Sequence, residues 1–297
     1  MKLLVSGATG FIGRHLIERL IKERHHVVAI VRPTTNADWL KSVKIKINIF
    51  DGNMDNLITF MSKEKFDGVI HLASLFLAKH KSSDVIELIN SNVGFSATLL
   101  EASVSSQTAW FINTGTFWQH YQNKQYSPVN LYSATKQAFE SIAQYYIETA
   151  NINFVTIKLC DTFGPGDTRP KVMNLWSKIS STGEALDMSP GEQIIDISFV
   201  DNVVDGYDRM IEILSRDKKK SLNGHSFAIS SPERMTLKQL SAVFERVTKK
   251  KLNLNWGKMA YRPREVMTPW ERGQTIPGWK SKISIAEGIK RTFNVTS

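Results

Sequence analysis

Cysteine is nearly absent from this sequence of 297 residues, which contains only Cys160. A single thiol can form neither an internal disulfide nor a multi-thiolate metal site, and this composition suits a reducing compartment. Long hydrophobic runs are also missing. The opening apolar run, 2–5, is too short for the core of a signal peptide, and no run approaches the roughly 20 apolar residues of a membrane helix. We therefore expect a cytoplasmic protein with no membrane partner and no bound metal.

Acidic residues are outnumbered, because 38 Lys and Arg residues against 28 Asp and Glu residues give a formal net charge of +10. Such an excess suits nucleic acid, an acidic membrane surface or a small polyanionic ligand. The lysine runs 218–220 and 249–251 fall at expected helix ends, where cations are favoured and solvated. No nucleic-acid-binding motif accompanies them. We expect no nucleic-acid partner, and we expect part of the charge to serve anionic small molecules.

Short β-like runs alternate with helical segments through the first half of the chain, which is the pattern of a parallel sheet covered by helices on both faces. The helix expected at 11–24 has apolar residues at helical spacing, and two longer helices are expected at 84–103 and 131–150. The expected strands are 2–6, 27–31, 45–50, 68–72, 109–113 and 153–159. The sequence therefore predicts an α/β fold built on a doubly wound parallel sheet.

A glycine-rich loop follows the first expected strand and opens the first expected helix. Its three glycines are spaced three residues apart, and glycine lets a backbone approach a pyrophosphate that rests on a helix N-terminus. With a strand before it, and a helix and a second strand after it, this loop predicts a dinucleotide-binding Rossmann domain. The expected cofactor contacts from the loop are Gly7, Thr9, Gly10, Phe11, Ile12 and Gly13.

The end of the second expected strand distinguishes NADP from NAD. A carboxylate at this place binds the ribose 2′-hydroxyl of NAD, whereas an arginine accommodates the 2′-phosphate of NADP. The sequence has Arg32 here and no carboxylate. NADP is therefore the expected cofactor, with Arg32 as its phosphate ligand; an exposed arginine without a ligand is the alternative.

The glycine spacing resembles that of the extended short-chain dehydrogenase/reductases, the NAD-dependent epimerase/dehydratase family. The stretches 158–167 and 193–203 are similar to the family's Arg-x-x-Asn-Val-Tyr-Gly-Pro-Gly-Asp and Arg-Asp-Phe-x-Tyr-Val-Asp-Asp-Val segments. The resemblance implies that Asp51 meets the adenine and that the backbone of Leu72, Ala73 and Ser74 lines the cofactor. For His71, beside them, we expect a packed and hydrogen-bonded role.

Tyr132 and Lys136 are four residues apart at the start of an expected helix, and hence on one face. A nearby cation stabilises phenolate, so we expect a lowered pKa for Tyr132, which would carry a proton. The preceding stretch 111–118 resembles the family's Ser-Ser-x-x-Val-Tyr-Gly segment, which implies that Thr114 holds the active-site position, with Thr116 in reserve. Thr114, Tyr132 and Lys136 are the expected catalytic residues. Tyr132 and Lys136 are also expected to contact the cofactor.

Beyond the turn 164–167 the regular alternation weakens. We expect an NADP-binding domain over 1–165, with 191–214 packing back on it. A smaller, discontinuous α/β substrate-binding lobe is expected to be formed mostly by 166–297. The family's phosphate-binding Arg is replaced by Ile195, so other cations must bind a substrate diphosphate. The expected substrate contacts are Thr116, Asp161, Arg169, Lys171 and Arg262.

Within the family, the sequence is most similar to the 4-ketoreductases of the CDP-abequose and CDP-paratose synthase type. This implies NADPH-dependent reduction of a 4-keto group on a nucleotide-linked deoxy sugar, with a CDP-sugar favoured, for a surface polysaccharide such as an O-antigen. A 4-epimerase is the alternative enzyme, and an inactive NADPH-sensing regulator is the alternative of another class. The family also implies a homodimer through the two long helices. Burial within one chain would account equally well for the apolar positions concerned, which are Ile86, Ile89, Ala138 and Tyr145.

Overall fold

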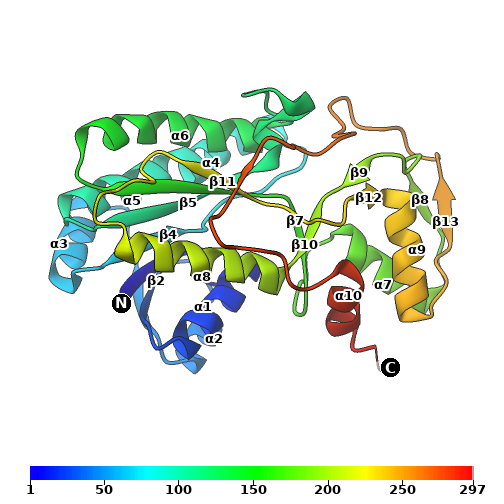
Figure 1. The fold of residues 1–297 in the computed structure, drawn as a ribbon, viewed down its shortest axis with the longest axis horizontal. Coiled ribbons are helices and arrows are strands. Elements are labelled where there is room, and N and C mark those ends of the chain that lie inside the picture. Colours follow the sequence, from blue (N-terminus) through cyan, green and yellow to red (C-terminus); the bar gives the residue numbers. More distant parts are fainter. Residues whose placement is uncertain (296–297) are drawn as a thin grey trace.

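A computed structural model describes residues 1–295. Its main feature is an eight-stranded sheet in the order β14-β11-β6-β5-β4-β1-β2-β3, in which every pairing is parallel (Figure 1). The strands are β1 (Lys2–Ser6), β2 (His26–Val31), β3 (Lys46–Ile49), β4 (Gly68–His71), β5 (Trp110–Thr116), β6 (Asn153–Leu159), β11 (Ser226–Ile229) and β14 (Gln274–Thr275). All six strands expected from the sequence are present. This topology confirms the predicted fold class.

Helices cover both faces of this sheet (Figure 1). On one face lie α1 (Phe11–Lys22), α2 (Asp38–Ser42) and α8 (Val200–Arg216); on the other lie α3 (Met54–Glu64), α4 (Val85–Ile89), α5 (Phe95–Ser105) and α6 (Leu131–Thr149). The central strand β6 is buried along its whole length, as a parallel strand between two helical layers must be. No helix in residues 1–295 is long and apolar enough to cross a membrane.

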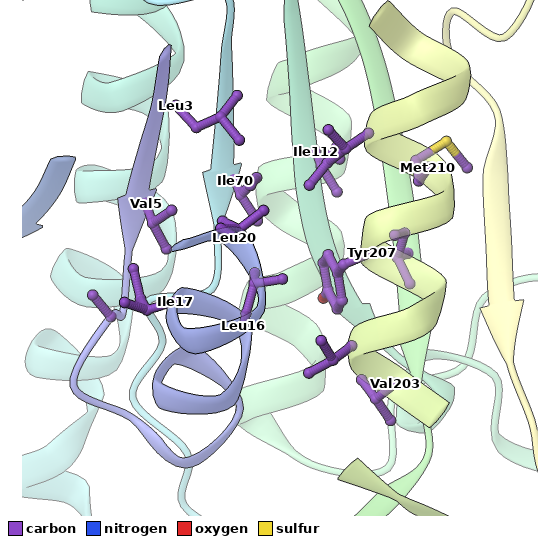
Figure 2. Packing of buried hydrophobic residues seen from close by; sticks show 14 of the residues in the cluster. Leu3, Val5, Leu16, Ile17, Leu20, Ile70, Ile112, Val203, Tyr207 and Met210 are labelled. Carbon is purple, nitrogen blue, oxygen red and sulfur yellow. The ribbon is translucent and has the colours of Figure 1, made fainter. Parts of the chain in front are cut away.

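Two apolar layers hold the helices to the sheet. One joins α1 and α8 to the strands through side chains such as Leu16, Ile112 and Met210 (Figure 2). The other joins α3, α5 and α6 to the opposite face through Leu57, Leu99 and Phe139. With this packing, the carboxyl ends of β1, β4, β5 and β6 lie at one edge of the sheet. Parallel α/β folds bind their ligands at this edge.

The helix expected at 84–103 is interrupted. It consists of a 3₁₀ turn η1 (Ser82–Asp84), α4, a π-helical turn η2 (Asn90–Gly94) and α5. The π turn carries the buried Asn92, whose side-chain amide forms hydrogen bonds with Leu75 in the loop after β4 and with Thr135 of α6. A π-helical turn inside a helix often marks a functional site, and this one faces the site described below.

A second group of elements lies beside the sheet and has its own apolar cluster, which includes Trp176, Leu240 and Ile289 (Figure 1). Its helices are α7 (Val172–Thr182), α9 (Leu237–Thr248) and α10 (Ile285–Phe293). Its two-stranded sheets pair β7 (Asp161–Phe163) with β10 (Ile197–Phe199), β9 (Ile194–Ile195) with β12 (Met235–Thr236), and β8 (Leu186–Met188) with β13 (Leu254–Trp256). Short 3₁₀ turns η3 (Phe117–Gln119) and η4 (Tyr121–Asn123) follow β5.

The chain crosses between the two groups repeatedly. After β13 it returns to the large sheet to add β14 and then runs back to α10 (Figure 1). We call the returning segment, residues 262–273, the strap. Its Trp270 stacks on His120 with ring centroids 4.0 Å apart, so the strap is held against the loop that follows β5.

Candidate active site

The glycine loop lies between β1 and α1. Gly7 has a φ of 70°, and a Cβ there would lie 2.6 Å from the Ala73 backbone nitrogen, so only glycine fits. A Cβ on Gly13 would collide with the Gly7 carbonyl oxygen. The N-cap of α1 is Gly10, which offers no side-chain acceptor, and the first turn carries no acidic residue. The amide groups that open α1 are thus left for an anion, as a pyrophosphate site requires.

A cavity of about 690 Å³ adjoins this loop, and its lining includes Gly7, Thr9, Gly10, Arg32, Leu72, Ala73 and Ser74. The structure brings these predicted cofactor contacts together around one space. Arg32 is exposed at its rim and forms no ion pair with any carboxylate in residues 1–295. An unpaired guanidinium beside a cavity of this size suits a phosphorylated ribose.

Asp51 does not line this cavity, although its neighbour Phe50 does. Its carboxylate accepts hydrogen bonds from the backbone N–H of Asn53 at 2.9 Å and from the side-chain amide of Asn56 at 2.8 Å. These two bonds hold the pKa of Asp51 below its usual range. The exposed carboxylate helps to order the start of α3, so its proposed contact with adenine has no support from the geometry.

His71 and Asn92 are buried next to the site and hold its loops and helices in place. His71 is buried and hydrogen-bonds the hydroxyls of Ser6 at 2.7 Å and Ser96 at 2.8 Å, so the predicted packed role is confirmed. Asn92 accepts from the Ser74 hydroxyl at 3.1 Å and donates to the Thr135 hydroxyl at 3.0 Å. It thereby joins the loop after β4 to α6, which fixes the distance between the cofactor cavity and the helix that carries Tyr132.

Tyr132 and Lys136 lie one turn apart near the start of α6, which Asn130 caps by accepting from the Ser133 backbone N–H at 3.0 Å. Burial raises the pKa of Tyr132 to about 12, against smaller lowering effects of the Ser74 and Thr116 hydroxyls. The expectation of a lowered pKa was wrong. Desolvation of the phenol dominates, and Lys136 is not among the groups that shift it. At neutral pH Tyr132 therefore keeps its proton and can donate it.

Lys136 is 2% exposed, and its burial lowers the pKa of the ammonium to about 8. Glu140, one turn further along α6, acts in the opposite direction and raises it. The ammonium in turn lowers the pKa of His71, which is held neutral chiefly by its burial. A buried ammonium that forms no ion pair in residues 1–295, and that faces a cavity, suits the hydroxyl groups of a ribose.

The two candidate threonines lie at the carboxyl end of β5 and point to different partners. The Thr114 hydroxyl is 2.7 Å from the Tyr207 hydroxyl of α8. The Thr116 hydroxyl accepts from the Trp118 backbone N–H at 3.3 Å, and it is the one that lowers the pKa of Tyr132. Both threonines line the same cavity as Tyr132. The sequence analysis favoured Thr114 over Thr116 as the catalytic residue, but no sequence motif indicated that Tyr207 would be its partner.

That cavity, of about 240 Å³, brings the expected substrate contacts to the expected catalytic residues. It is lined by Thr114, Thr116, Tyr132 and Lys136, and by Asp161, Arg169, Lys171 and Arg262. Arg169, Lys171 and Arg262 each have a carboxylate partner already, unlike Lys136. The nitrogen–oxygen distances are 2.9 Å for Lys171 to Asp161, 2.7 Å for Arg262 to Glu265 and 2.7 Å for Arg169 to Asp167. An incoming diphosphate would therefore compete with these carboxylates for the cations.

An aromatic wall, formed by Phe76 and Trp118, was not predicted from the sequence. Their ring centroids are 5.6 Å apart, and Phe76 also meets the ring of Tyr132 edge-on at 5.0 Å. Lys171 lies over Phe76 at 4.6 Å and Arg262 over Trp118 at 5.4 Å. The wall keeps water from one side of the phenol and holds two cations near the cavity mouth.

A buried polar cluster behind β5 was also missed. Lys158 on β6 is 2.9 Å from His120 and 3.2 Å from Glu140, and its ammonium lies 5.6 Å from the ring of Trp270 in the strap. Burial and the neighbouring ammonium lower the pKa of His120 to about 4, so the imidazole is neutral and can accept from Lys158. Four separate segments meet at this cluster, which fixes the end of β5 at Thr116 and the turn η3 that carries Trp118.

Comparisons with known proteins agree with this geometry. Residues 3–224 match the family model described as "NAD dependent epimerase/dehydratase family". CDP-abequose synthase from Salmonella muenchen is 26% identical over 299 residues, covering 99% of this chain and 97% of that protein. The CDP-abequose synthase of Yersinia pseudotuberculosis is 25% identical over 295 residues, covering 98% and 100%.

Solved structures of similar fold include two 4-epimerases. UDP-glucuronic acid 4-epimerase from Bacillus cereus, in complex with UDP-glucuronic acid and NAD, superimposes with a TM-score of 0.83 at 21% identity and covers 99% of this chain and 98% of that chain. UDP-glucose 4-epimerase from Thermotoga maritima, with UDP-glucose, superimposes with a TM-score of 0.84 at 19% identity and covers 99% of this chain and 98% of that chain. At these identities the likeness establishes the fold.

Proposed function

Because the chain belongs to the NAD dependent epimerase/dehydratase family, we propose that it is an NADPH-dependent reductase of a 4-keto group on a nucleotide-linked deoxy sugar. One observation carries the proposal: the phenol of Tyr132, whose pKa is raised to about 12, lies in a cavity with two threonine hydroxyls and the Lys136 ammonium. A protonated phenol is a proton donor, and reduction of a carbonyl group needs a proton donor. The cytoplasm, where nucleotide sugars are made, is the proposed place of action.

NADPH, when bound, would supply the hydride for the carbonyl carbon. The glycine loop and the open end of α1 would bind its pyrophosphate, Arg32 its 2′-phosphate, and Lys136 the nicotinamide ribose. What supports this fit is that Gly7, Gly10 and Arg32 line one cavity.

The remaining chemistry belongs to side chains of this protein. As negative charge develops on the carbonyl oxygen, Tyr132 would give that oxygen its phenolic proton, which yields the hydroxyl group of the product. A threonine hydroxyl, Thr114 or Thr116, would hold the same oxygen by a hydrogen bond. A phenol with a raised pKa is still far more acidic than an alcohol, so the proton transfer is favourable.

The substrate is proposed to be a CDP-linked deoxy sugar, because the full-length relatives described above are CDP-abequose synthases. Arg262, Lys171 and Arg169 would meet the diphosphate as it takes the place of their present carboxylate partners. Asp161 would then be free to accept hydrogen bonds from sugar hydroxyls. The product would be a sugar for a surface polysaccharide.

The test is to follow NADPH oxidation by the purified protein with CDP-, UDP- and dTDP-linked 4-keto-6-deoxy sugars. A reductase consumes one NADPH for each sugar reduced. A 4-epimerase takes a hydride from C4 of a 4-hydroxy sugar onto oxidised cofactor and returns it to the other face, so it would isomerise the corresponding 4-hydroxy sugars with no net change of the cofactor. An NADPH-sensing regulator would bind the cofactor and leave every sugar unchanged. Either of the last two results would overturn the proposal.

Arg32→Ala tests the preference for NADPH. Loss of a charge-assisted contact with the 2′-phosphate should weaken NADPH binding by about tenfold or more, while NADH binding stays unchanged. Fluorescence titration with both cofactors measures this. Arg216→Ala, which removes a surface guanidinium at the end of α8, is the control and should alter neither affinity. Equal affinities of the unmodified protein for NADPH and NADH would contradict the assignment.

A homodimer through α4 and α6 is proposed because these two helices expose apolar side chains. Ile86, Ile89 and Tyr145 are 66%, 41% and 64% exposed, and Ala138 is exposed as well. A second copy could cover all four in a symmetric contact. Light scattering should give twice the chain mass, and a double Ile86→Lys and Tyr145→Lys variant should be monomeric. Ile49→Lys, at an exposed isoleucine on β3, is the control; a monomeric unmodified protein would refute the dimer.

A further inference from the structure

Tyr207 lies on α8 with its side chain fully buried, and its hydroxyl is 2.7 Å from the Thr114 hydroxyl. Figure 2 shows the ring projecting from α8 into the apolar layer beside Leu16 of α1 and Ile112 of β5. Within residues 1–295 the Tyr207 hydroxyl has no other hydrogen-bonding partner. The ring is thus held by packing, and its single polar atom is directed at a threonine that lines the active-site cavity.

The position of α8 leaves this hydroxyl little freedom. Arg19 of α1 pairs with Asp205 of α8 at 2.6 Å, and the Trp279 indole donates to the Asn202 carbonyl at 3.1 Å. The ring also packs among the residues that join α1 and α8 to the sheet. Tyr207 therefore approaches Thr114 from a rigid element, whereas Thr114 has a cavity on its other side.

The number of available protons decides which hydroxyl donates in the hydrogen bond between Tyr207 and Thr114. A threonine hydroxyl has one proton to donate. If Thr114 gives it to a ligand oxygen in the cavity, the proton between the two hydroxyls must come from Tyr207. Burial raises the pKa of Tyr207, so its phenol stays protonated and can act as this donor. Hydrogen bonds in such a chain polarise one another, which makes Thr114 a better donor.

We propose that Tyr207 is a positioning residue, which fixes the Thr114 rotamer and directs the Thr114 proton toward the carbonyl oxygen of the substrate. The inference rests on the proposed reductase function. It also assigns the oxygen-holding role to Thr114, while Thr116 acts on Tyr132. A phenylalanine at 207 would fill the same apolar layer, so the tyrosine hydroxyl is needed only for its contact with Thr114.

Tyr207→Phe should lower kcat by about tenfold and leave NADPH affinity unchanged, because it removes one hydrogen bond outside the cofactor cavity. In a Thr114→Val background the same change should have no further effect, since the hydroxyl it supports is gone. Tyr146→Phe is the matched control, because it also removes a phenol hydroxyl. That hydroxyl donates to Glu101 at 2.7 Å and lies outside the cavity, so kcat should not change.

A second readout does not depend on turnover. In protein labelled at threonine methyl groups, the Thr114 signal should report one rotamer, and Tyr207→Phe should shift it to an average of several. An unchanged Thr114 signal would overturn the positioning role whatever the substrate is. The positioning role would also be overturned if Tyr207→Phe lowered kcat by the same factor in the unmodified protein and in the Thr114→Val variant. A shifted signal in a protein that reduces no keto sugar would retain the positioning role and refute the reductase function alone.

Discussion

Tyr132→Phe should reduce turnover by about 10²–10⁴-fold and leave NADPH affinity unchanged. The phenyl ring keeps the edge-on contact with Phe76 at the aromatic wall, so packing around the cavity is preserved. Only the proton donor is lost. The remaining rate would come from water as the acid and from the threonine hydroxyl that still holds the substrate oxygen.

Single-turnover oxidation of bound NADPH by the keto sugar measures this loss at the chemical step. Tyr126→Phe, at a half-exposed tyrosine outside the cavity, is the control and should react like the unmodified protein. A Tyr132→Phe variant that oxidised NADPH at the unmodified rate would remove Tyr132 as proton donor. Thr116 and Ser74, whose hydroxyls act on the same phenol, would then be the next candidates.

Lys136→Met should weaken NADPH binding by about tenfold or more and lower turnover as well, because one ammonium is proposed to bind the ribose and to order the site around Tyr132. Methionine has similar length and suits a side chain that is 2% exposed, so the fold should survive. Fluorescence titration and single-turnover rates separate the two effects. Undiminished NADPH affinity would contradict the ribose contact.

The same lysine predicts how binding depends on pH. Burial lowers the Lys136 pKa to about 8, with Glu140 opposing the shift, and the buried His71 nearby stays neutral. An anionic cofactor favours the charged lysine, so affinity is full well below this pKa and falls as pH rises through it. NADPH titrations from neutral to alkaline pH should show that decline, and Lys136→Met should abolish it. An equal decline in both proteins would assign the titration elsewhere.

Local patterns predicted the first half of the fold well, because each parallel strand there is a short apolar run and each crossover helix follows it directly. They could not reveal β11 and β14, since β11 pairs with β6, and β14 with β11, only through contacts far away in sequence. The same applies to the π turn at Asn92. Its geometry is set by hydrogen bonds to the loop after β4 and to α6, and no local propensity encodes these.

The candidate site could be predicted from the sequence where a motif and its chemistry coincide. Gly7, Tyr132 and Lys136 follow from spacing, because a phosphate loop and a helix face each impose a local constraint. The direction of the Tyr132 pKa was wrong, because sequence shows a neighbouring cation but does not show how deeply a phenol is desolvated. Tyr207 reads as an ordinary core position on an amphipathic helix, and only the fold places it against Thr114.

The strand order also sets when the molecule can become stable. All seven residues of β6 are buried, yet its outer neighbour β11 is synthesised only after the second group of elements has begun, and β14 later still. Until then a nascent chain presents β6 as an open sheet edge, the kind of surface that pairs with other chains. We expect the growing polypeptide to depend on chaperones until residue 275 has emerged. A fragment that stops before residue 226 should aggregate rather than act as a separate cofactor-binding domain.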